Sequence, residues 1–64
     1  MERMTPNKRE IRAMRQNGDS PWEILACVVN SGVEFPDAVW TVSSALGLNA
    51  EERKQMERDY DECC

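Results

Sequence analysis

The most constraining feature of this chain is a run of six apolar residues, from Ile24 to Val29, which directly follows a strong helix-start signal. A helix made from such a run is apolar on every side, and a helix of that kind has to be buried all round. The chain has only 64 residues, so few other elements are left to surround it. We therefore expect a second copy of the chain or another protein to supply the missing cover, which indicates an assembling or binding protein.

The length and the cysteines bound the kind of domain. A domain of this size buries only about 60% of the surface that its unfolded chain exposes, so residues 1–64 are expected to form one small domain that gains from self-association. The three cysteines are an odd number, and two of them, Cys63 and Cys64, are adjacent, which does not suggest a disulfide framework. The chain has no histidine and no zinc-ligand spacing, so we expect neither a metal nor a cofactor.

Charge and hydropathy limit the partners. Residues 1–18 carry five basic and two acidic side chains, whereas residues 19–64 carry three basic and ten acidic ones. The acidic body repels nucleic acid and anionic membranes, so such contacts would have to use the basic first helix. The first residues lead into charged sequence rather than a secretory signal. No stretch approaches the roughly 20 apolar residues that span a bilayer. We expect a cytoplasmic protein with reduced thiols and no membrane contact.

The first helix is predicted over residues 6–17, and we expect it to be weakly anchored. Thr5 is a suitable cap before Pro6, and Asn17-Gly18 is a suitable stop. Its only sizeable apolar side chains are Ile11 and Met14. Four basic residues are candidates for contact with an acidic partner or with nucleic acid: Lys8, Arg9, Arg12 and Arg15.

The second helix has the clearest boundary. Ser20-Pro21-Trp22-Glu23 combines a capping serine, a proline at the first helical position and a glutamate at the third, which is a capping box. The helix is expected to continue to about Asn30. A rival interpretation places a short strand within residues 28–35, because β-branched Val28 and Val29 are followed by further apolar residues beyond Gly32.

The third helix is predicted to begin at Phe35-Pro36-Asp37 and to end before Gly47. At about 100° per residue, its apolar side chains gather into one stripe made of Ala38, Val39, Val42, Ala45 and Leu46. Trp40 lies almost opposite that stripe, beside Ser43 and Ser44.

The fourth helix is predicted from Ala50 to about Asp61, with Asn49 as cap and Glu52 as its capping-box partner. Met56 and Tyr60, with Cys63 as a further candidate, form a thin apolar seam. The acidic residues near its end oppose the helix dipole, so residues 59–64 are expected to be a frayed acidic tail. Together these patterns predict an all-α chain of three to four short helices.

The residue inventory disfavours an enzyme. There is no histidine for general base catalysis, no glycine-rich phosphate loop, and no cysteine beside an activating partner. Asp59, Asp61 and Glu62 lack the glycine and ligand pattern of a calcium-binding loop, so we interpret them as a solvated tail. Cys27 is expected to be a small buried hydrophobic residue.

A DNA-binding regulator is the alternative function. Residues 39–49 resemble the first helix and turn of a helix-turn-helix, with Gly47 at the position that the turn requires. However, Arg53 stands where the second helix should bury an apolar side chain, and that helix also carries Glu51, Glu52 and Glu57. A helix that faces phosphates should be basic or neutral. The motif is therefore degenerate, and nucleic acid is a less suitable partner than protein.

The aromatic residues give the sharper indication of an interface. Ordinary core packing explains Trp22 and Phe35 well, because large aromatics dominate small cores. Trp40 instead lies off the core stripe among small serines, which is typical of an interface anchor. The residues predicted to serve self-association or a partner are Trp22, Ile24, Leu25, Val28, Val29, Phe35, Val39 and Trp40.

Three segments carry a resemblance to a known class of protein. The segments are residues 20–23 (Ser-Pro-Trp-Glu), residues 34–40 (Glu-Phe-Pro-Asp-Ala-Val-Trp) and the ending at residues 59–64. With the short basic opening, they make the chain similar to small accessory proteins encoded in the early regions of lambdoid temperate phages. The resemblance implies a non-enzymatic protein of the host cytoplasm that favours lytic development by acting on host or phage partners. Some such proteins form intertwined helical dimers.

Taken together, the sequence predicts a helical homodimer formed through the second and third helices, intertwined if the resemblance holds. It also predicts a hydrophobic groove near Trp40 that takes an amphipathic helix of a host or phage protein.

Overall fold

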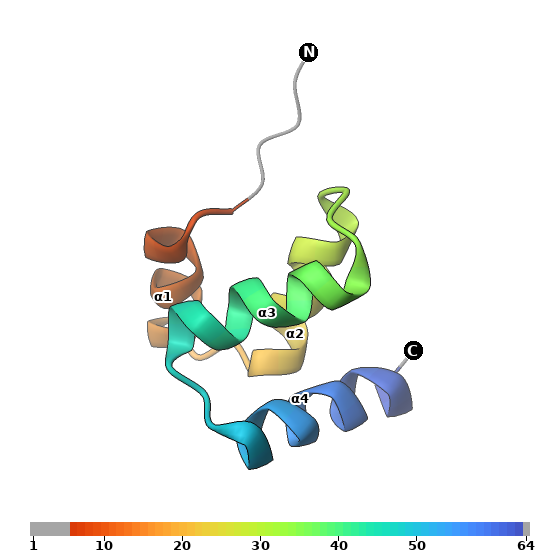
Figure 1. Ribbon diagram of the computed structural model, residues 1–64. Coiled ribbons are helices and arrows are strands. Elements are labelled where there is room, and N and C mark those ends of the chain that lie inside the picture. The colour runs from red at the N-terminus through yellow and green to blue at the C-terminus, as the bar shows by residue number, and fades with distance from the viewer. Residues whose placement is uncertain (1–5, 64) are drawn as a thin grey trace.

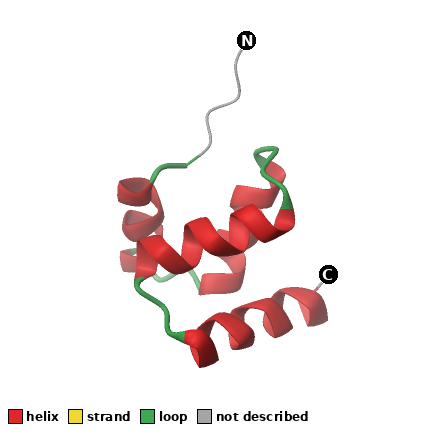
Figure 2. Ribbon diagram, in the orientation of Figure 1, coloured by secondary structure: helices red, strands yellow, loops and turns green. Residues whose placement is uncertain are grey.

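The computed structural model describes residues 6–63, which form four helices and, within that range, no strand (Figures 1 and 2). The helices are α1 (Lys8–Gln16), α2 (Pro21–Asn30), α3 (Phe35–Leu46) and α4 (Ala50–Cys63). The all-α prediction is confirmed. The rival strand at residues 28–35 is wrong, because α2 continues to Asn30 and a turn then leads into α3.

The start of α1 differs from the sequence prediction. Asn7, not Thr5, is the cap: its Oδ1 accepts the backbone N–H of Glu10 at 2.9 Å, and the Glu10 carboxylate accepts the N–H of Asn7 at 3.1 Å. Thr5 lies outside the described residues. Asn7 and Glu10 have the three-residue spacing of a capping box, and an asparagine satisfies the free N–H groups at a helix start well. This reciprocal pair fixes the beginning of α1.

The other helix boundaries follow their local signals. The Glu23 carboxylate accepts the backbone N–H of Ser20 at 2.8 Å at the start of α2. Before α4, Asn49 Oδ1 accepts the backbone N–H of Glu52 at 2.8 Å, and the Glu52 carboxylate accepts the N–H of Asn49 at 3.0 Å. Gly47 ends α3 with φ at +68°, in the left-handed region that glycine adopts without steric cost.

The fourth helix is longer than predicted. It runs to Cys63 instead of ending near Asp61, and the fraying expected for its acidic end stays a prediction. Met56 is buried and Tyr60 is partly buried, as the predicted seam requires, but Cys63 is exposed.

The helices pack around one core, with α3 in contact with each of the other three (Figure 1). In that view α1 stands at one end of α3, α2 lies behind it, and α4 runs beneath it. The second helix also contacts α1 and α4. The buried apolar residues are Ile11, Ile24, Leu25, Val28, Ala38, Val39, Val42, Ala45 and Met56.

Half of the apolar run of α2 is covered within one chain. Ile24, Leu25 and Val28 are at most 1% exposed, and they share a core cluster with Ile11 of α1 and Met56 of α4. These three residues need no cover from outside the chain, and cover of the rest of the run by a second copy or a partner stays a prediction. The run is also not buried all round: Cys27 is exposed, which corrects its interpretation as a buried hydrophobic residue. Three helices contact α2, whereas the sequence analysis expected few elements to surround it.

Within residues 6–63, no helix combines the length and the apolar character that crossing a membrane requires.

Candidate interaction groove

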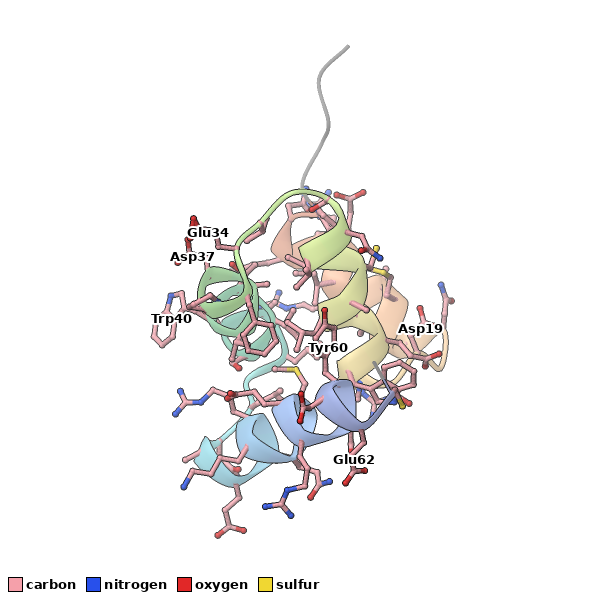
Figure 3. The ribbon with its side chains drawn as sticks, turned by 90° about the vertical axis from the view of Figure 1, so that its right-hand side faces the viewer. Asp19, Glu34, Asp37, Trp40, Tyr60 and Glu62 are labelled. Atoms are coloured by element: carbon pink, nitrogen blue, oxygen red, sulfur yellow. The ribbon has the colours of Figure 1, made fainter. Side chains whose placement is uncertain are left out.

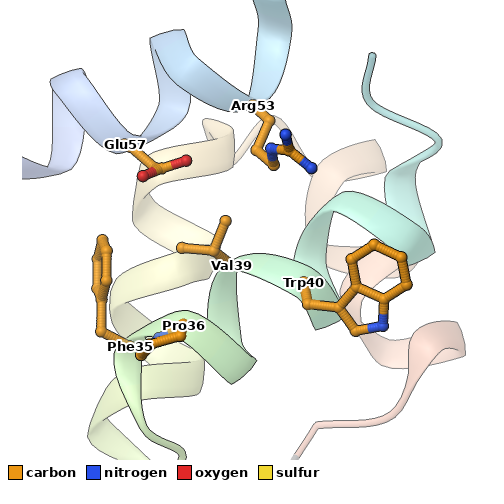
Figure 4. A pocket seen from close by; sticks show the side chains of 6 residues that line it. All are labelled: Phe35, Pro36, Val39, Trp40, Arg53 and Glu57. Carbon is orange, nitrogen blue, oxygen red and sulfur yellow. The ribbon is translucent and has the colours of Figure 1, made fainter. Parts of the chain in front are cut away.

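A shallow groove of about 370 Å³ lies between the first half of α3 and the middle of α4 (Figure 4). We call it the Trp40 groove. It is lined by Phe35, Pro36, Val39 and Trp40 of α3 and by Arg53 and Glu57 of α4. Helical spacing brings the four apolar side chains of α3 together, and Arg53 and Glu57, four residues apart, lie on one face of α4.

The two large exposed apolar side chains of the described residues both line this groove. Trp40 is 67% exposed and Phe35 is 37% exposed. Val39, at 7%, belongs to the core and lies between them (Figure 4). Phe35 also packs against Tyr60 of α4, with ring centroids 5.3 Å apart and tilted by 41°. Phe35 is therefore held in place by α4, whereas the indole of Trp40 projects into solvent.

The charges around the groove are arranged unevenly. On α4, Arg53 lies on the Trp40 side and Glu57 on the Phe35 side (Figure 4). On the α3 edge, exposed Glu34 and Asp37 project from the same side of the molecule as Trp40 (Figure 3). The α3 edge is thus acidic, and the α4 edge carries a cation close to Trp40.

The residues predicted for an interface divide into two groups. Ile24, Leu25 and Val28 are buried in the core, and Trp22 and Val29 are partly buried against it. The three buried residues present no surface in the single chain, whereas Trp22 and Val29 keep part of theirs, so an interface role for these two stays a prediction. Phe35, Val39 and Trp40 do come together, as the lining of one groove.

The predicted basic contact residues are not equivalent. Lys8 and Arg9 are exposed on α1. Arg12 instead donates its Nε–H to the backbone carbonyl of Ala45 at 3.0 Å, in a partly buried bond that ties α1 to the last turn of α3. Arg15 donates to the carbonyl of Asp19 at 3.4 Å. A cation at the C-terminal end of a helix stabilises its free carbonyls, so Arg12 has a structural role that the sequence pattern did not reveal.

Two features of the site were missed or misread. The sequence analysis noted Arg53 only because a charged residue does not fit that position of a helix-turn-helix. In the structure Arg53 lines the Trp40 groove. Ser43 was placed beside Trp40 as a small surface residue, but it is 6% exposed and its hydroxyl has no hydrogen-bond partner among residues 6–63. Of the two serines, Ser44 alone is exposed near Trp40 on α3.

The chemistry available elsewhere is limited. Glu51 and Glu52 are exposed on the first turn of α4, the helix that would have to face phosphates in a helix-turn-helix. Among residues 6–63, no group of three or more histidine, cysteine, aspartate or glutamate residues is placed to hold a metal ion.

Comparison of the chain with protein-family models, with curated proteins and with solved structures finds no match.

Proposed function

We propose that this chain is a non-enzymatic protein-interaction module that works through the Trp40 groove. The observation that carries the proposal is the exposure of Trp40, at 67%, beside a groove in a chain that buries its aliphatic residues. Tryptophan is enriched among the residues that dominate binding energy at interfaces. An exposed indole beside a hollow is a strong basis for a binding site.

The form of the groove favours a helical partner segment. Its apolar lining follows the α3 positions 35, 36, 39 and 40 and is bounded by α4, so it extends along the helix pair. An amphipathic helix that lays its apolar face along such a groove is a common recognition mode. Aliphatic side chains of the partner would supply contact area, and Trp40 would supply specificity.

The biological setting is proposed from resemblance. Similarity of residues 20–23 and 34–40 to early accessory proteins of lambdoid temperate phages favours a role in lytic development in the host cytoplasm, through host or phage proteins. The alternative, a DNA-binding regulator, has less support, because exposed Glu51 and Glu52 lie on the helix that would approach phosphates.

The test is affinity capture from a bacterial lysate with three forms of the chain: wild type, Trp40→Ala and Ser44→Ala. Ser44 is exposed on α3 but does not line the groove, so it is a matched control. We expect wild type and Ser44→Ala to retain the same proteins and Trp40→Ala to lose them. Unchanged capture by a folded Trp40→Ala variant would contradict the proposal.

A further inference from the structure

We propose that the Trp40 groove selects its helical partner by the order of the partner's charges: an acidic residue binds Arg53, and a basic residue about one turn later binds Glu57. The inference rests on the proposed function of the groove. It adds the charge pattern and the direction of the helix that the groove takes. Arg53 and Glu57 then determine specificity, while the apolar lining supplies contact area.

Arg53 and Glu57 are the two charged residues that line the groove, and both are available to a docked molecule. Their side chains are partly buried, and neither side chain makes a hydrogen bond or an ion pair with residues 6–63. They stand four residues apart on α4, where opposite charges can pair, but an arginine that precedes a glutamate is the less favourable order. A partly buried charge gains more from an opposite charge than a fully hydrated one does.

The two charges follow one another along the groove. Arg53 lies on the Trp40 side and Glu57 on the Phe35 side, with Val39 between the two aromatic residues (Figure 4). At a rise of about 1.5 Å per residue, the four-residue step separates them by about 6 Å along α4. Side chains three or four residues apart on a docked helix have a similar separation. An acid and a base at this spacing can therefore meet Arg53 and Glu57 at once.

The other charges near the groove leave this order intact. Exposed Glu34 precedes Phe35 at the start of α3, so it adds negative charge at the end that holds Glu57. Asp37 projects from the same side of the molecule as Trp40 but does not line the groove. Because Asp37 is exposed, salt and water screen it more than the partly buried Arg53. The Phe35 end thus attracts a base, and the Trp40 end attracts an acid.

Helix energetics set the direction of the partner. A glutamate four residues before a lysine stabilises a helix more than the reverse order does. Acidic residues near the N-terminus and basic residues near the C-terminus also suit the helix dipole. A helix with its acid first is therefore the better-formed partner. With that acid on Arg53 and its base on Glu57, the partner runs in the direction of α4 and opposite to α3 (Figure 1).

The same two charges disfavour helices with charges of a single sign. A helix with only basic flanks suits Glu57 and is repelled by Arg53, and one with only acidic flanks is repelled by Glu57. A wholly apolar helix would cover both charges without pairing either, which is costly. Unfavourable contacts with the wrong partners give specificity as much as favourable contacts with the right one.

The test uses three model helices without tryptophan that share one face of leucines and differ only in their flanking charges. The mixed helix has a glutamate and, one turn later, a lysine; the others have two lysines or two glutamates. NMR titration of the full chain follows the indole N–H signal of Trp40, which Trp40→Phe identifies by its loss. Salt at about 0.15 M screens the general attraction of basic peptides to the net charge of −4. We expect the mixed helix to bind about tenfold or more tightly than either other helix.

Charge reversals in the groove should change which helix binds best. Arg53→Glu should prefer the helix with two lysines, and Glu57→Arg the one with two glutamates, because each variant leaves the lining with one sign of charge. Each variant gains affinity for one helix, which a misfolded chain would not do. Arg58→Glu and Glu62→Arg are matched controls: they make the same changes at exposed residues of α4 with the same order and spacing, outside the groove. Both controls should keep the preference of wild type.

The direction of docking is measured with a nitroxide attached to one end of the mixed helix. In wild type, a nitroxide at the acidic end should broaden the Trp40 indole signal more than one at the basic end. In the double variant Arg53→Glu/Glu57→Arg this order should reverse, because the positions of the two charges are exchanged. The double control Arg58→Glu/Glu62→Arg should behave like wild type.

Equal affinity of wild type for the three helices, no binding of the mixed helix, or groove variants that keep the wild-type preference would overturn the inference. The proposed function is tested separately by capture. Loss of captured proteins from Trp40→Ala, with no change for Arg53→Glu or Glu57→Arg, would keep the groove as a binding site and reject its selection by charge. Retained capture by a folded Trp40→Ala variant would reject the function on which the inference rests.

Discussion

The second and third helices have similar composition but opposite relations to solvent. Both begin with a proline in the first turn, and both are rich in apolar residues. The second helix turns Ile24, Leu25 and Val28 inward, and its exposed positions carry small or polar side chains such as Cys27. The third helix buries small aliphatic residues on one face and leaves its largest side chain, Trp40, 67% exposed on the other.

The residues that stabilise this small domain are separate from those that remain available for binding. Aliphatic side chains from all four helices form one core, so we expect the chain to fold without the indole of Trp40. A large apolar side chain that the core does not need is available for another molecule. We therefore expect substitutions in α2 to change folding, and substitutions at Trp40 to change association.

The largest expected effect is on folding, from Leu25→Ala. Leu25 is fully buried, so its truncation should lower the free energy of unfolding by about 2–4 kcal/mol. Cys27→Ala, at an exposed position two residues along the same helix, should change it by less than about 0.5 kcal/mol. Urea denaturation followed by circular dichroism measures both. Equal losses would mean that α2 is not divided into a buried and an exposed side.

An intermediate effect is expected for Arg12→Ala. Removing the bond from Arg12 to the carbonyl of Ala45 should lower the free energy of unfolding by about 1–2 kcal/mol, because the acceptor is partly buried and the donor is charged. Lys8→Ala removes an equal charge from the exposed side of α1 and should cost less than about 0.5 kcal/mol. The same denaturation experiment compares them. An Arg12→Ala variant as stable as Lys8→Ala would show that α1 is not held to α3 by this contact.

A change of the opposite sign is expected for Ser43→Ala. The Ser43 hydroxyl is buried without a hydrogen-bond partner in the described part of the chain, and burying such a group costs about 1–3 kcal/mol in mutational data. Because alanine also favours helix, the variant should be as stable as wild type or more stable by up to about 1 kcal/mol. Thermal unfolding shows whether Ser43→Ala raises or lowers the melting temperature. A clear loss of stability would mean that the hydroxyl has a partner in solution.

The smallest expected effect on folding is that of Trp40→Ala. The indole is mostly in solvent, so the free energy of unfolding should change by less than about 1 kcal/mol. Dilute samples keep association from contributing to the denaturation measurement. A loss comparable to that of Leu25→Ala would place Trp40 in the core and remove the contrast between α2 and α3.

Much of the local structure followed from short sequence signals. The capping box at Ser20 and Glu23, the pair Asn49 and Glu52, and Gly47 placed the boundaries of α2, α3 and α4. The start of α1 was misplaced because the prediction used Thr5-Pro6 and did not consider Asn7, which has Glu10 three residues later. The local capping-box spacing of Asn7 and Glu10 would have been enough to find this start.

The arrangement in space was harder to predict. Helical periodicity shows which side chains share a face but does not show how many neighbours cover it. The cover of α2 by Ile11 and Met56 was underestimated for this reason. Ser43 is buried because three helices contact α3, which widens its buried side beyond one apolar stripe. The position of Trp40 was predicted correctly, since it lies nearly opposite the stripe whatever the neighbours are.

The central claim, that Trp40 is free in the single chain and covered on association, is tested most directly by tryptophan fluorescence. In Trp22→Phe, Trp40 is the sole tryptophan. For the chain alone we expect red-shifted emission that acrylamide quenches readily, and with the mixed helix a blue shift with protection from the quencher. Trp40→Phe, which leaves only the partly buried Trp22, should show no comparable change when the helix is added. Blue-shifted, protected emission from Trp40 in the chain alone would contradict the account.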